Sequence, residues 1–377
     1  MVNVICDPVV WTRHRRVARE SGGLLIRGML ERARGSPTSW PNASRSCRSG
    51  CTRNPGTSDE PTGSRVRHPP SELRWHLADQ ERDGQIALFG LDGLTGPDRS
   101  TGRLSGLEFL HVAAKRIINE VPSRSPVPFR WTINVYRGCS HACTYCFARP
   151  THSYLGLNIG EDFDRKIVVK INAVERVRAE LADPRWQGDS IAMGTNTDPY
   201  QRAEGKYRLT RGVLQALAER GNPVSILTKS PLVLRDLDVL TDAAARTSVQ
   251  VNLSIGTLDE RVWRSTEPGT PHPRRRLSAL RTLAEAGIRT GALVAPVLPG
   301  LSDQPEQLRE LTQAILDTGG HVVGVSALHL RPGTREHFLQ WLAGFDSDLY
   351  RNYLRRYRDG AYARRSTPSG YGPSSPK

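Results

Sequence analysis

The chain has 377 residues, enough for one barrel-sized α/β domain with extensions or for two ordinary domains. No apolar run has membrane-spanning length, and Leu24–Ile26 is too short for a signal peptide, so composition argues against a membrane or secreted protein. Six cysteines in so long a chain are no secreted disulfide framework, because clustered thiols in a reducing compartment more often bind metal or do chemistry. We expect a cytoplasmic protein.

The formal charge of +15 is concentrated at the two ends of the chain. Counting Lys and Arg against Asp and Glu, residues 1–75 carry +7, residues 351–377 carry +6, and the residues between carry only +2. Both ends are rich in Ser, Pro, Gly and Arg, so we expect a disordered basic extension over 1–75 and a helix followed by a disordered tail over 344–377. Such ends can touch polyanions weakly through counterion release, but we interpret them as solvated tails or, upstream, as a stretch of dubious coding status. The near-neutral centre gives a nucleic-acid partner no support.

Strand-like and helical patterns alternate between these ends. Residues 76–125 form a lead-in, in which a helical piece is expected at Leu107–Glu120. Residues 126–343 form the core domain, where short runs rich in branched residues recur and predict strands. The expected strands are Arg130–Val135, Ser190–Met193, Val224–Thr228, Val249–Ile255, Ile288–Val294 and Val322–Leu328.

Helical patterns separate these strands. The expected starts are Thr210, Ser230 with Pro231, Pro273, and Ser302 or Asp303, and the expected ends include Gly221 and Gly287. Strand and helix alternating about six times imply a parallel sheet with right-handed crossovers, and mostly apolar strands imply that both faces are covered. The fold class is therefore α/β, and a barrel, whole or partial, is its natural closure.

Unusual polar residues follow the end of each expected strand. In a barrel of parallel strands these ends meet at one rim, where active groups gather. From the first strand to the sixth, the polar segments are Arg137–Pro150, Gly194–Gln201, Lys229, Ser254 with Thr257, Ala295–Gly300 and His329–Arg331.

The first of these segments holds three thiols within eight residues, at Cys139, Cys143 and Cys146. Structural zinc usually takes four ligands, commonly as two separated pairs, and iron–sulfur clusters normally take a fourth cysteine. No fourth cysteine exists outside the N-terminal extension, where Cys47 and Cys51 are interpreted as coincidental. A cluster with three protein ligands keeps one iron open, so we expect a small molecule to complete it.

The spacing C-x3-C-x2-C after the first strand of a barrel resembles the radical S-adenosylmethionine (SAM) superfamily. The segments "YRGCSHACTYCFARPTH", "GTNTDPYQRAE", "LTKS", "EPGTPHPRRRLSAL" and "APVLPGLSD" are similar to the branch related to spore photoproduct lyase. The resemblance covers roughly Pro126–Ala343.

The resemblance implies a partial, TIM-like (β/α)6 barrel. It implies that Cys139, Cys143 and Cys146 hold a [4Fe–4S] cluster whose open iron is chelated by SAM. An electron from the reduced cluster would cleave SAM to methionine and a 5′-deoxyadenosyl radical, which abstracts hydrogen from substrate. An electron donor such as flavodoxin or ferredoxin is implied as partner; the substrate and the catalytic residues are not assigned.

The resemblance also implies cofactor-binding residues at the rim. They are the aromatic residues Tyr145 and Phe147 on the adenine side, Gly194, Thr197 and Asp198 toward the methionine amino group, Lys229 toward the methionine carboxylate, and Ser254 toward the ribose or carboxylate. Several have structural alternatives, since aromatic residues can plug a barrel mouth and Asp before Pro often opens a turn.

Other polar residues are interpreted more plainly. Arg274–Arg276 is expected to be a solvated helix face, although "EPGTP" just before it lies where a substrate or SAM contact could occur. His141 is expected to orient the loop or be exposed, and His329 and Arg331 are unassigned.

One departure from the family pattern concerns the hydrogen-atom donor. Spore photoproduct lyase carries a cysteine near the second strand, whereas this chain has Thr195 there and no thiol after Cys146. A threonine hydroxyl holds its hydrogen too firmly for that role, which argues against lesion repair by the same mechanism. Tyr200 is the alternative hydrogen-atom donor considered.

The alternative function is a non-catalytic zinc- or iron-binding module. In it His141 joins the three cysteines as metal ligand and the basic ends bind nucleic acid.

Overall fold

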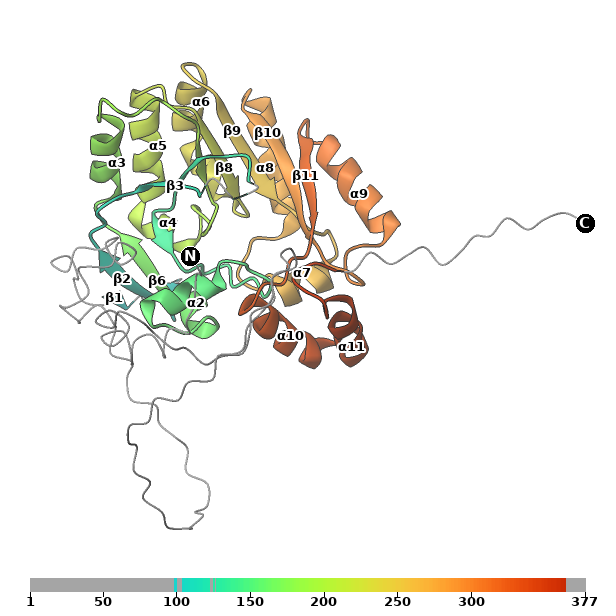
Figure 1. The fold of residues 1–377 in the computed structure, drawn as a ribbon. Helices are drawn as coiled ribbons and strands as arrows, with labels where there is room; N and C mark the ends of the chain where they lie inside the picture. The colour runs from blue at the N-terminus through green and yellow to red at the C-terminus, as the bar shows by residue number, and fades with distance from the viewer. Residues whose placement is uncertain (1–97, 100–103, 123–124, 126, 364–377) are drawn as a thin grey trace, which may run out of the picture. The chain divides into compact units, whose positions relative to one another are not determined.

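A seven-stranded sheet organises the protein in the computed structural model, which describes residues 98–99, 104–122, 125 and 127–363 (Figure 1). The strand order is β11-β10-β9-β8-β7-β4-β3; only β3 runs antiparallel to its neighbour, and the other pairs are parallel. The strands are β3 (Ile118–Glu120), β4 (Trp131–Ile133), β7 (Ile191–Met193), β8 (Val224–Thr228), β9 (Val249–Ser254), β10 (Arg289–Val297) and β11 (His321–Ala327). All six strands predicted from the sequence are confirmed.

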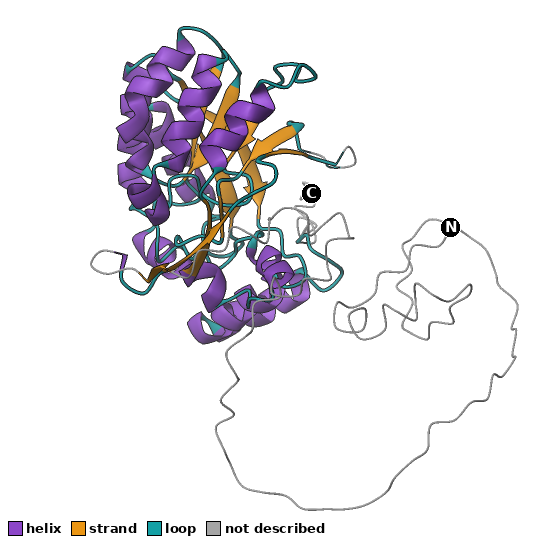
Figure 2. Cartoon of the chain, turned by 90° about the vertical axis from the view of Figure 1, so that its left-hand side faces the viewer, coloured by secondary structure: helices purple, strands orange, loops and turns teal. Residues whose placement is uncertain are grey.

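Helices line one face of this sheet (Figure 2). They are α3 (Ala173–Leu181), α5 (Leu209–Glu219), α6 (Leu237–Ala244), α8 (Pro273–Glu285) and α9 (Pro305–Leu316). The cross-strand neighbours Met193, Ile226 and Val251 are buried in one apolar core with residues of these helices, such as Leu214 and Leu283. Burial of this face supplies the main driving force for the layer arrangement.

Helix starts were predicted with mixed success. Ser230 caps the 3-10 helix Pro231–Asp236 through a hydrogen bond from Leu232 N, and Pro273 opens α8 as expected. Thr210 was wrong as a cap, because it lies inside α5, where its hydroxyl donates to Pro199 O. Ser302 and Asp303 were also wrong: Gln304 precedes α9, and both side chains accept hydrogen bonds from the preceding loop instead.

A second, four-stranded sheet corrects the prediction for the lead-in. The helix expected at Leu107–Glu120 is absent from the described residues, since β2 (Glu108–Val112) and β3 occupy this stretch. Strand β2 pairs in parallel with β6 (Lys166–Lys170), and the sheet has the order β1-β2-β6-β5, with β1 at Asp98–Arg99 and β5 at Tyr136–Arg137. Pairing with a distant strand overrides the local helical pattern.

The C-terminal part of the described chain forms two helices that pack beside the cysteine loop. They are α10 (Thr334–Phe345) and α11 (Ser347–Arg356), the second of which confirms the helical pattern expected after residue 344. Phe338 and Tyr353 share an apolar cluster with Cys143, and Thr334 Oγ1 donates a 3.2 Å hydrogen bond to Cys146 O. The α10–α11 pair, labelled in Figure 1, therefore supports the cysteine loop through these contacts.

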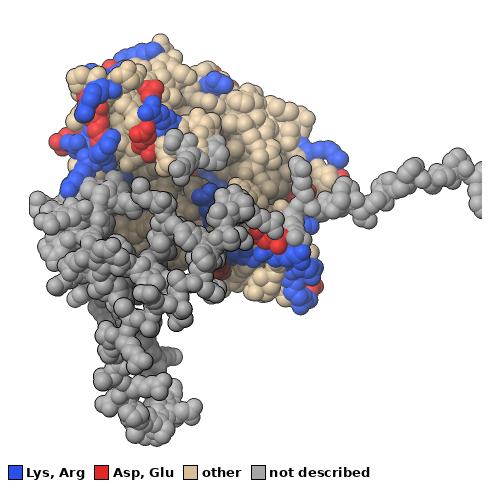
Figure 3. Space-filling view, viewed as in Figure 1, with Lys and Arg blue, Asp and Glu red and all other residues tan. Residues whose placement is uncertain are grey.

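The remaining elements are short: α2 (Glu161–Arg165), α4 (Arg202–Tyr207), α7 (Glu260–Thr266) and the 3-10 helix Arg149–Leu155. Among the described residues, no helix combines the length and the hydrophobicity that a transmembrane span needs. On the face shown in Figure 3, acidic and basic side chains are interspersed over α3 and α5, as in the 2.8 Å ion pair of Arg178 with Glu219. The predicted disorder of 1–75 and of the final tail lies outside the described residues, apart from the part of the tail up to residue 363.

Candidate cofactor site

The cysteine loop begins where β5 ends, and its backbone is tightly confined. Gly138 has a positive φ of 80°, and a Cβ there would lie 2.8 Å from the His152 ring and 3.0 Å from Lys166 O. Ala142 also adopts the left-handed region, with φ 53°, which is unfavourable for a residue with a side chain. Such conformations persist only where the surroundings enforce them, so the loop is held in a defined shape.

A buried arginine reinforces this shape. Arg149 is 1% exposed, and its Nε donates to Cys143 O at 3.0 Å. The rest of its guanidinium binds the Ile159 and Gly160 carbonyls and forms a 2.9 Å ion pair with Asp164. The sequence alone gave no reason to select Arg149.

The three thiols form a donor set that suits a metal–sulfur centre. All three are free, Cys139 and Cys143 are buried, and Cys146 is half-buried. Burial and the nearby Cys139 thiol raise the pKa of Cys146 to about 11, and burial followed by the Glu267 charge raises that of Cys143. Thiols that oppose one another's ionisation in a buried pocket are deprotonated by metal ligation, and thiolates suit iron–sulfur centres.

The described residues do not support a zinc site that includes His141. They contain no group of three or more His, Cys, Asp or Glu side chains that could hold a single metal ion. A four-iron cluster is wider than one ion and does not require its ligands to meet at one point. The geometry of the described residues therefore gives the zinc alternative no support.

His141 binds the neighbouring strand end. It is 3% exposed, which corrects the expectation of an exposed residue, and its Nδ1 lies 3.3 Å from Asp198 Oδ2, an ion pair without hydrogen-bond geometry. Burial by itself would lower the pKa of His141, but the Asp198 charge and the Cys139 thiol raise it to about 10. His141 is therefore a loop-orienting cation, as one of the two sequence interpretations had it.

Asp198 connects the second and third strand ends to this histidine. Its Oδ1 accepts from Thr228 Oγ1 at 2.6 Å and its Oδ2 accepts from Lys229 N at 2.7 Å. Burial opposes its ionisation, but His141 and these hydrogen bonds lower its pKa. The tertiary structure thus gives Asp198 a structural duty beside the binding role expected for it.

Gly194 and Thr197 also have structural duties. Gly194 has φ 88°, and a Cβ would lie 1.9 Å from Leu227 O, so no other residue fits between these strands. Thr197 Oγ1 donates to Gly138 O at 2.6 Å, and Gln201 Nε2 donates to the same carbonyl at 3.0 Å. Gly194 thus lets the segment after β7 pack closely against β8, and Thr197 and Gln201 fix this segment against the cysteine loop.

Lys229 ends in a buried polar network with Tyr145 and Ser254. Its Nζ donates to Ser254 Oγ at 2.9 Å and to Tyr145 Oη at 3.2 Å, and it forms a 2.9 Å ion pair with Glu267 Oε1. The structure therefore brings together three of the residues selected from the sequence. Phe147 is the exception among the aromatic residues, since its side chain is 59% exposed.

Glu267 and Arg276 complete this network and were not selected from the sequence. Arg276 is 1% exposed and donates to Glu267 Oε2 at 2.5 Å and to Ser254 O at 2.9 Å, so the expected solvated helix face is wrong at this position. Burial would raise the pKa of Glu267, but the Arg276 and Lys229 charges hold it far below its usual value. The "EPGTP" motif was the signal that could have found Glu267.

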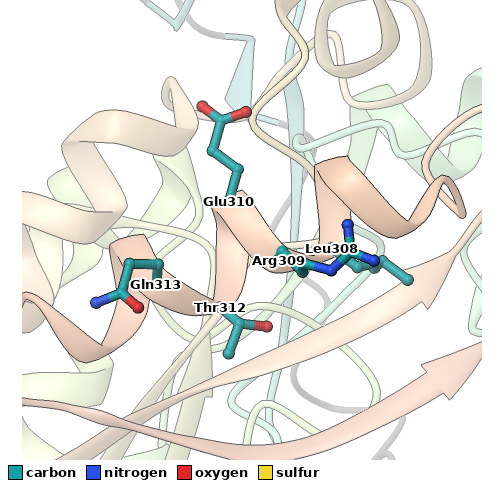
Figure 4. A pocket seen from close by; sticks show the side chains of 5 residues that line it. All are labelled: Leu308, Arg309, Glu310, Thr312 and Gln313. Atoms are coloured by element: carbon teal, nitrogen blue, oxygen red, sulfur yellow. The ribbon is translucent and has the colours of Figure 1, made fainter.

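Two other features lie apart from this network. His329 stacks on Tyr362 at a ring-centroid distance of 4.2 Å and does not join the cysteine loop's contacts, while Arg331 is exposed. The surface hollow in Figure 4 is lined by residues of one helix, α9, none of which is a site residue: Leu308, Arg309, Glu310, Thr312 and Gln313.

Comparison with known proteins identifies the family. A profile described as the Radical SAM superfamily matches residues 133–312, from β4 into α9. An uncharacterized protein of Mycobacterium tuberculosis is 46% identical over 280 residues, covering 74% of this chain and 82% of the relative. An uncharacterized protein of Methanocaldococcus jannaschii is 34% identical over 199 residues, 53% of this chain and 71% of the relative.

Among solved structures, spore photoproduct lyase complexed with dinucleoside spore photoproduct is similar, with a TM-score of 0.47 and 17% identity over 67% of this chain and 81% of that one. The region matched by the radical SAM profile, residues 133–312, contains the cysteine loop, Lys229, Glu267 and Arg276. The chain therefore belongs to the radical SAM superfamily, enzymes that use a [4Fe–4S] cluster and S-adenosylmethionine.

Proposed function

We propose that this enzyme holds a [4Fe–4S] cluster on Cys139, Cys143 and Cys146 and cleaves SAM reductively to act on a substrate through a 5′-deoxyadenosyl radical. The observation that supports this most is the meeting of three free thiols with a buried lysine network at the carboxyl ends of parallel strands. When bound, the cluster would supply the electron that cleaves the sulfonium. The residues around it bind, orient and exclude water.

The charge of the Lys229 network supports a carboxylate ligand. Lys229 and Arg276 carry two positive charges, whereas Glu267 carries one negative charge, and all three are largely buried. A buried surplus of positive charge is costly until an anion joins it. We therefore assign the methionine carboxylate of SAM to Lys229, with Ser254 beside it.

The remaining SAM-binding residues are assigned from their positions at the ends of the strands. Tyr145 and Phe147 flank Cys146 and would border the adenine, Phe147 with the exposed ring that a ligand can cover. Asp198, with Gly194 and Thr197, would receive the methionine amino group. Their structural contacts make these residues rigid, which favours orientation of a bound ligand.

The substrate would enter against the sheet face opposite the helices, in a partial barrel. This face carries a row of paired residues on neighbouring strands: Thr132 pairs with Ala192, Ala192 with Ser225, and Ser225 with Gln250. Asn252 lies on the same face of β9, two residues after Gln250. These side chains are polar but uncharged, which suits neutral hydrogen-bonding groups better than phosphates. Together with Thr195 in place of a thiol, this favours a substrate other than the DNA lesion of spore photoproduct lyase, although we place the chain in the branch related to that enzyme.

The reaction also needs an electron donor, for which a flavodoxin or ferredoxin is proposed, and a reducing compartment, for which the cytoplasm is proposed. Free thiols at the site suit such a compartment.

Anaerobic purification tests the proposal. We expect brown protein with about four irons and four sulfides per chain and, with SAM and dithionite, 5′-deoxyadenosine and methionine. Cys143→Ala should lose cluster and product, whereas Cys51→Ala, a matched thiol outside the described residues, should keep both. Colourless protein with stoichiometric zinc would overturn the proposal in favour of the metal-binding module.

A further inference from the structure

The segment Thr266–Thr270, which joins α7 to α8, lies directly against the cysteine loop; we name it the bracing segment. Thr144 N donates to Thr266 O at 2.9 Å, and Gly269 N donates to His141 O at 3.1 Å. These two hydrogen bonds join backbone atoms more than 120 residues apart in the sequence. They flank Cys143, one on each side, so they fix the backbone that carries this ligand.

Gly269 allows this close approach. A Cβ at this position would lie 2.1 Å from Ser140 O and 2.9 Å from His141 C, far inside contact distance. Both atoms belong to the backbone and cannot move aside as a flexible side chain can. Any side chain at Gly269 would therefore push the cysteine loop away from the bracing segment.

Glu267, in the middle of the bracing segment, joins the cysteine loop to two strand ends. Its Oε1 accepts from Tyr145 Oη and from Lys229 Nζ. Its Oε2 accepts from Arg276, whose guanidinium also binds Ser254 O at the end of β9. One carboxylate thus ties the residue between Cys143 and Cys146 to the ends of β8 and β9.

We propose that the bracing segment is a positioning element that holds the cysteine loop in its cluster-receiving conformation before any cofactor binds, with Gly269 and Glu267 as its positioning residues. The inference rests on the proposed function for the identity of the cluster, but the conformation of the loop is a property of the apo protein. Neither residue contacts the cluster iron in this role; each acts through the loop.

The test compares Gly269→Ala with Gly344→Ala. The control adds the same methyl in α10, where nothing lies within 4 Å of it. Hydrogen exchange of apo protein should show peptides covering residues 139–147 exchanging at least tenfold faster in G269A than in wild type and G344A. After anaerobic reconstitution, G269A should hold at least fivefold less iron, with circular dichroism close to that of wild type.

A second variant keeps the test decisive if G269A does not fold. Tyr145→Phe removes only the hydroxyl that Glu267 binds, and apo Y145F should show about threefold faster exchange in the same peptides. Unchanged exchange in Y145F and in any folded G269A, with wild-type iron content, would overturn the inference while leaving the proposed function intact. If wild type itself binds no iron, the proposed function fails, and loop exchange still decides the bracing role.

Discussion

Two lysines with largely buried side chains lie at strand ends, one beside each sheet, and their surroundings differ. Lys229, after β8 of the large sheet, has a carboxylate and two hydroxyl partners within 3.2 Å. Lys170, the last residue of β6 in the small sheet, is 5% exposed, and the described residues give its ammonium no hydrogen bond or ion pair. Burial, aggravated by the Arg137 charge and only partly offset by Glu180, lowers the pKa of Lys170 to about 7.

The comparison separates a compensated charge from an uncompensated one. A buried charge is tolerated when opposite charges and hydrogen bonds replace its water, and otherwise costs several kcal/mol or is neutralised. Lys229 has Glu267 as a compensating carboxylate, whereas Lys170 reduces the stability of the small sheet at neutral and acidic pH.

The largest expected effect comes from removing the compensating charge. Glu267→Gln should destabilise the apo protein by about 3–5 kcal/mol, because it leaves Lys229 and Arg276 buried without their anion. Since the folded-state pKa of Glu267 is depressed, its contribution is full above the usual glutamate pKa and is lost only as pH falls through the lower, folded value. The urea midpoint of the variant should therefore lie below that of wild type by the same amount at pH 8 and at pH 6. Identical midpoints for the two proteins would contradict this account.

Replacing the uncompensated lysine should have the opposite sign. Lys170→Met is expected to stabilise the protein by about 3 kcal/mol at pH 6, where both folded and unfolded wild type carry the charge. As pH rises from about 7 toward 10.5, the folded lysine is neutral while the unfolded one is still protonated, so wild type gains stability and the advantage of the variant shrinks. Urea unfolding at pH 6 and pH 10 measures this; an advantage independent of pH would refute it.

The two lysines should also differ in ligand binding. Lys229→Met is expected to weaken SAM binding about 100-fold, or about 2.7 kcal/mol, through loss of the carboxylate partner. Lys170→Met, the matched substitution in the other sheet, should bind SAM as wild type does. Equilibrium dialysis with anaerobically reconstituted protein compares them, with iron content as the check that each variant holds its cluster. Equal affinity of the two variants would remove Lys229 from the SAM site.

The smallest effect is expected at the exposed edge of the site. Phe147→Ala should change unfolding free energy by no more than about 0.5 kcal/mol, because the ring is 59% exposed. If the ring borders the adenine, SAM binding should nonetheless weaken about threefold in the same dialysis. A large loss of stability with unchanged affinity would make Phe147 a packing residue instead.

Much of this architecture was predictable because it depends on local patterns. The six parallel strands are short runs rich in branched residues, separated by helices with Pro and Gly signals, and each was found at nearly its observed position. The lead-in was not predictable, because Glu108–Val112 becomes a strand only by pairing with Lys166–Lys170, far along the chain. Local propensity contains no information about a pairing partner so far away in the sequence.

For the site, the sequence by itself determined the three cysteines, since their spacing within one loop limits what the thiols can bind. It also determined the order of the polar segments at the strand ends. Only the tertiary structure decided that Glu267 and Arg276 belong with Lys229 and Tyr145. Charged residues in a helical pattern are usually solvated, and their burial depends on opposite charges contributed by distant segments. The identity of a ligand loop is thus encoded locally, whereas its electrostatic support arises when the strand ends meet.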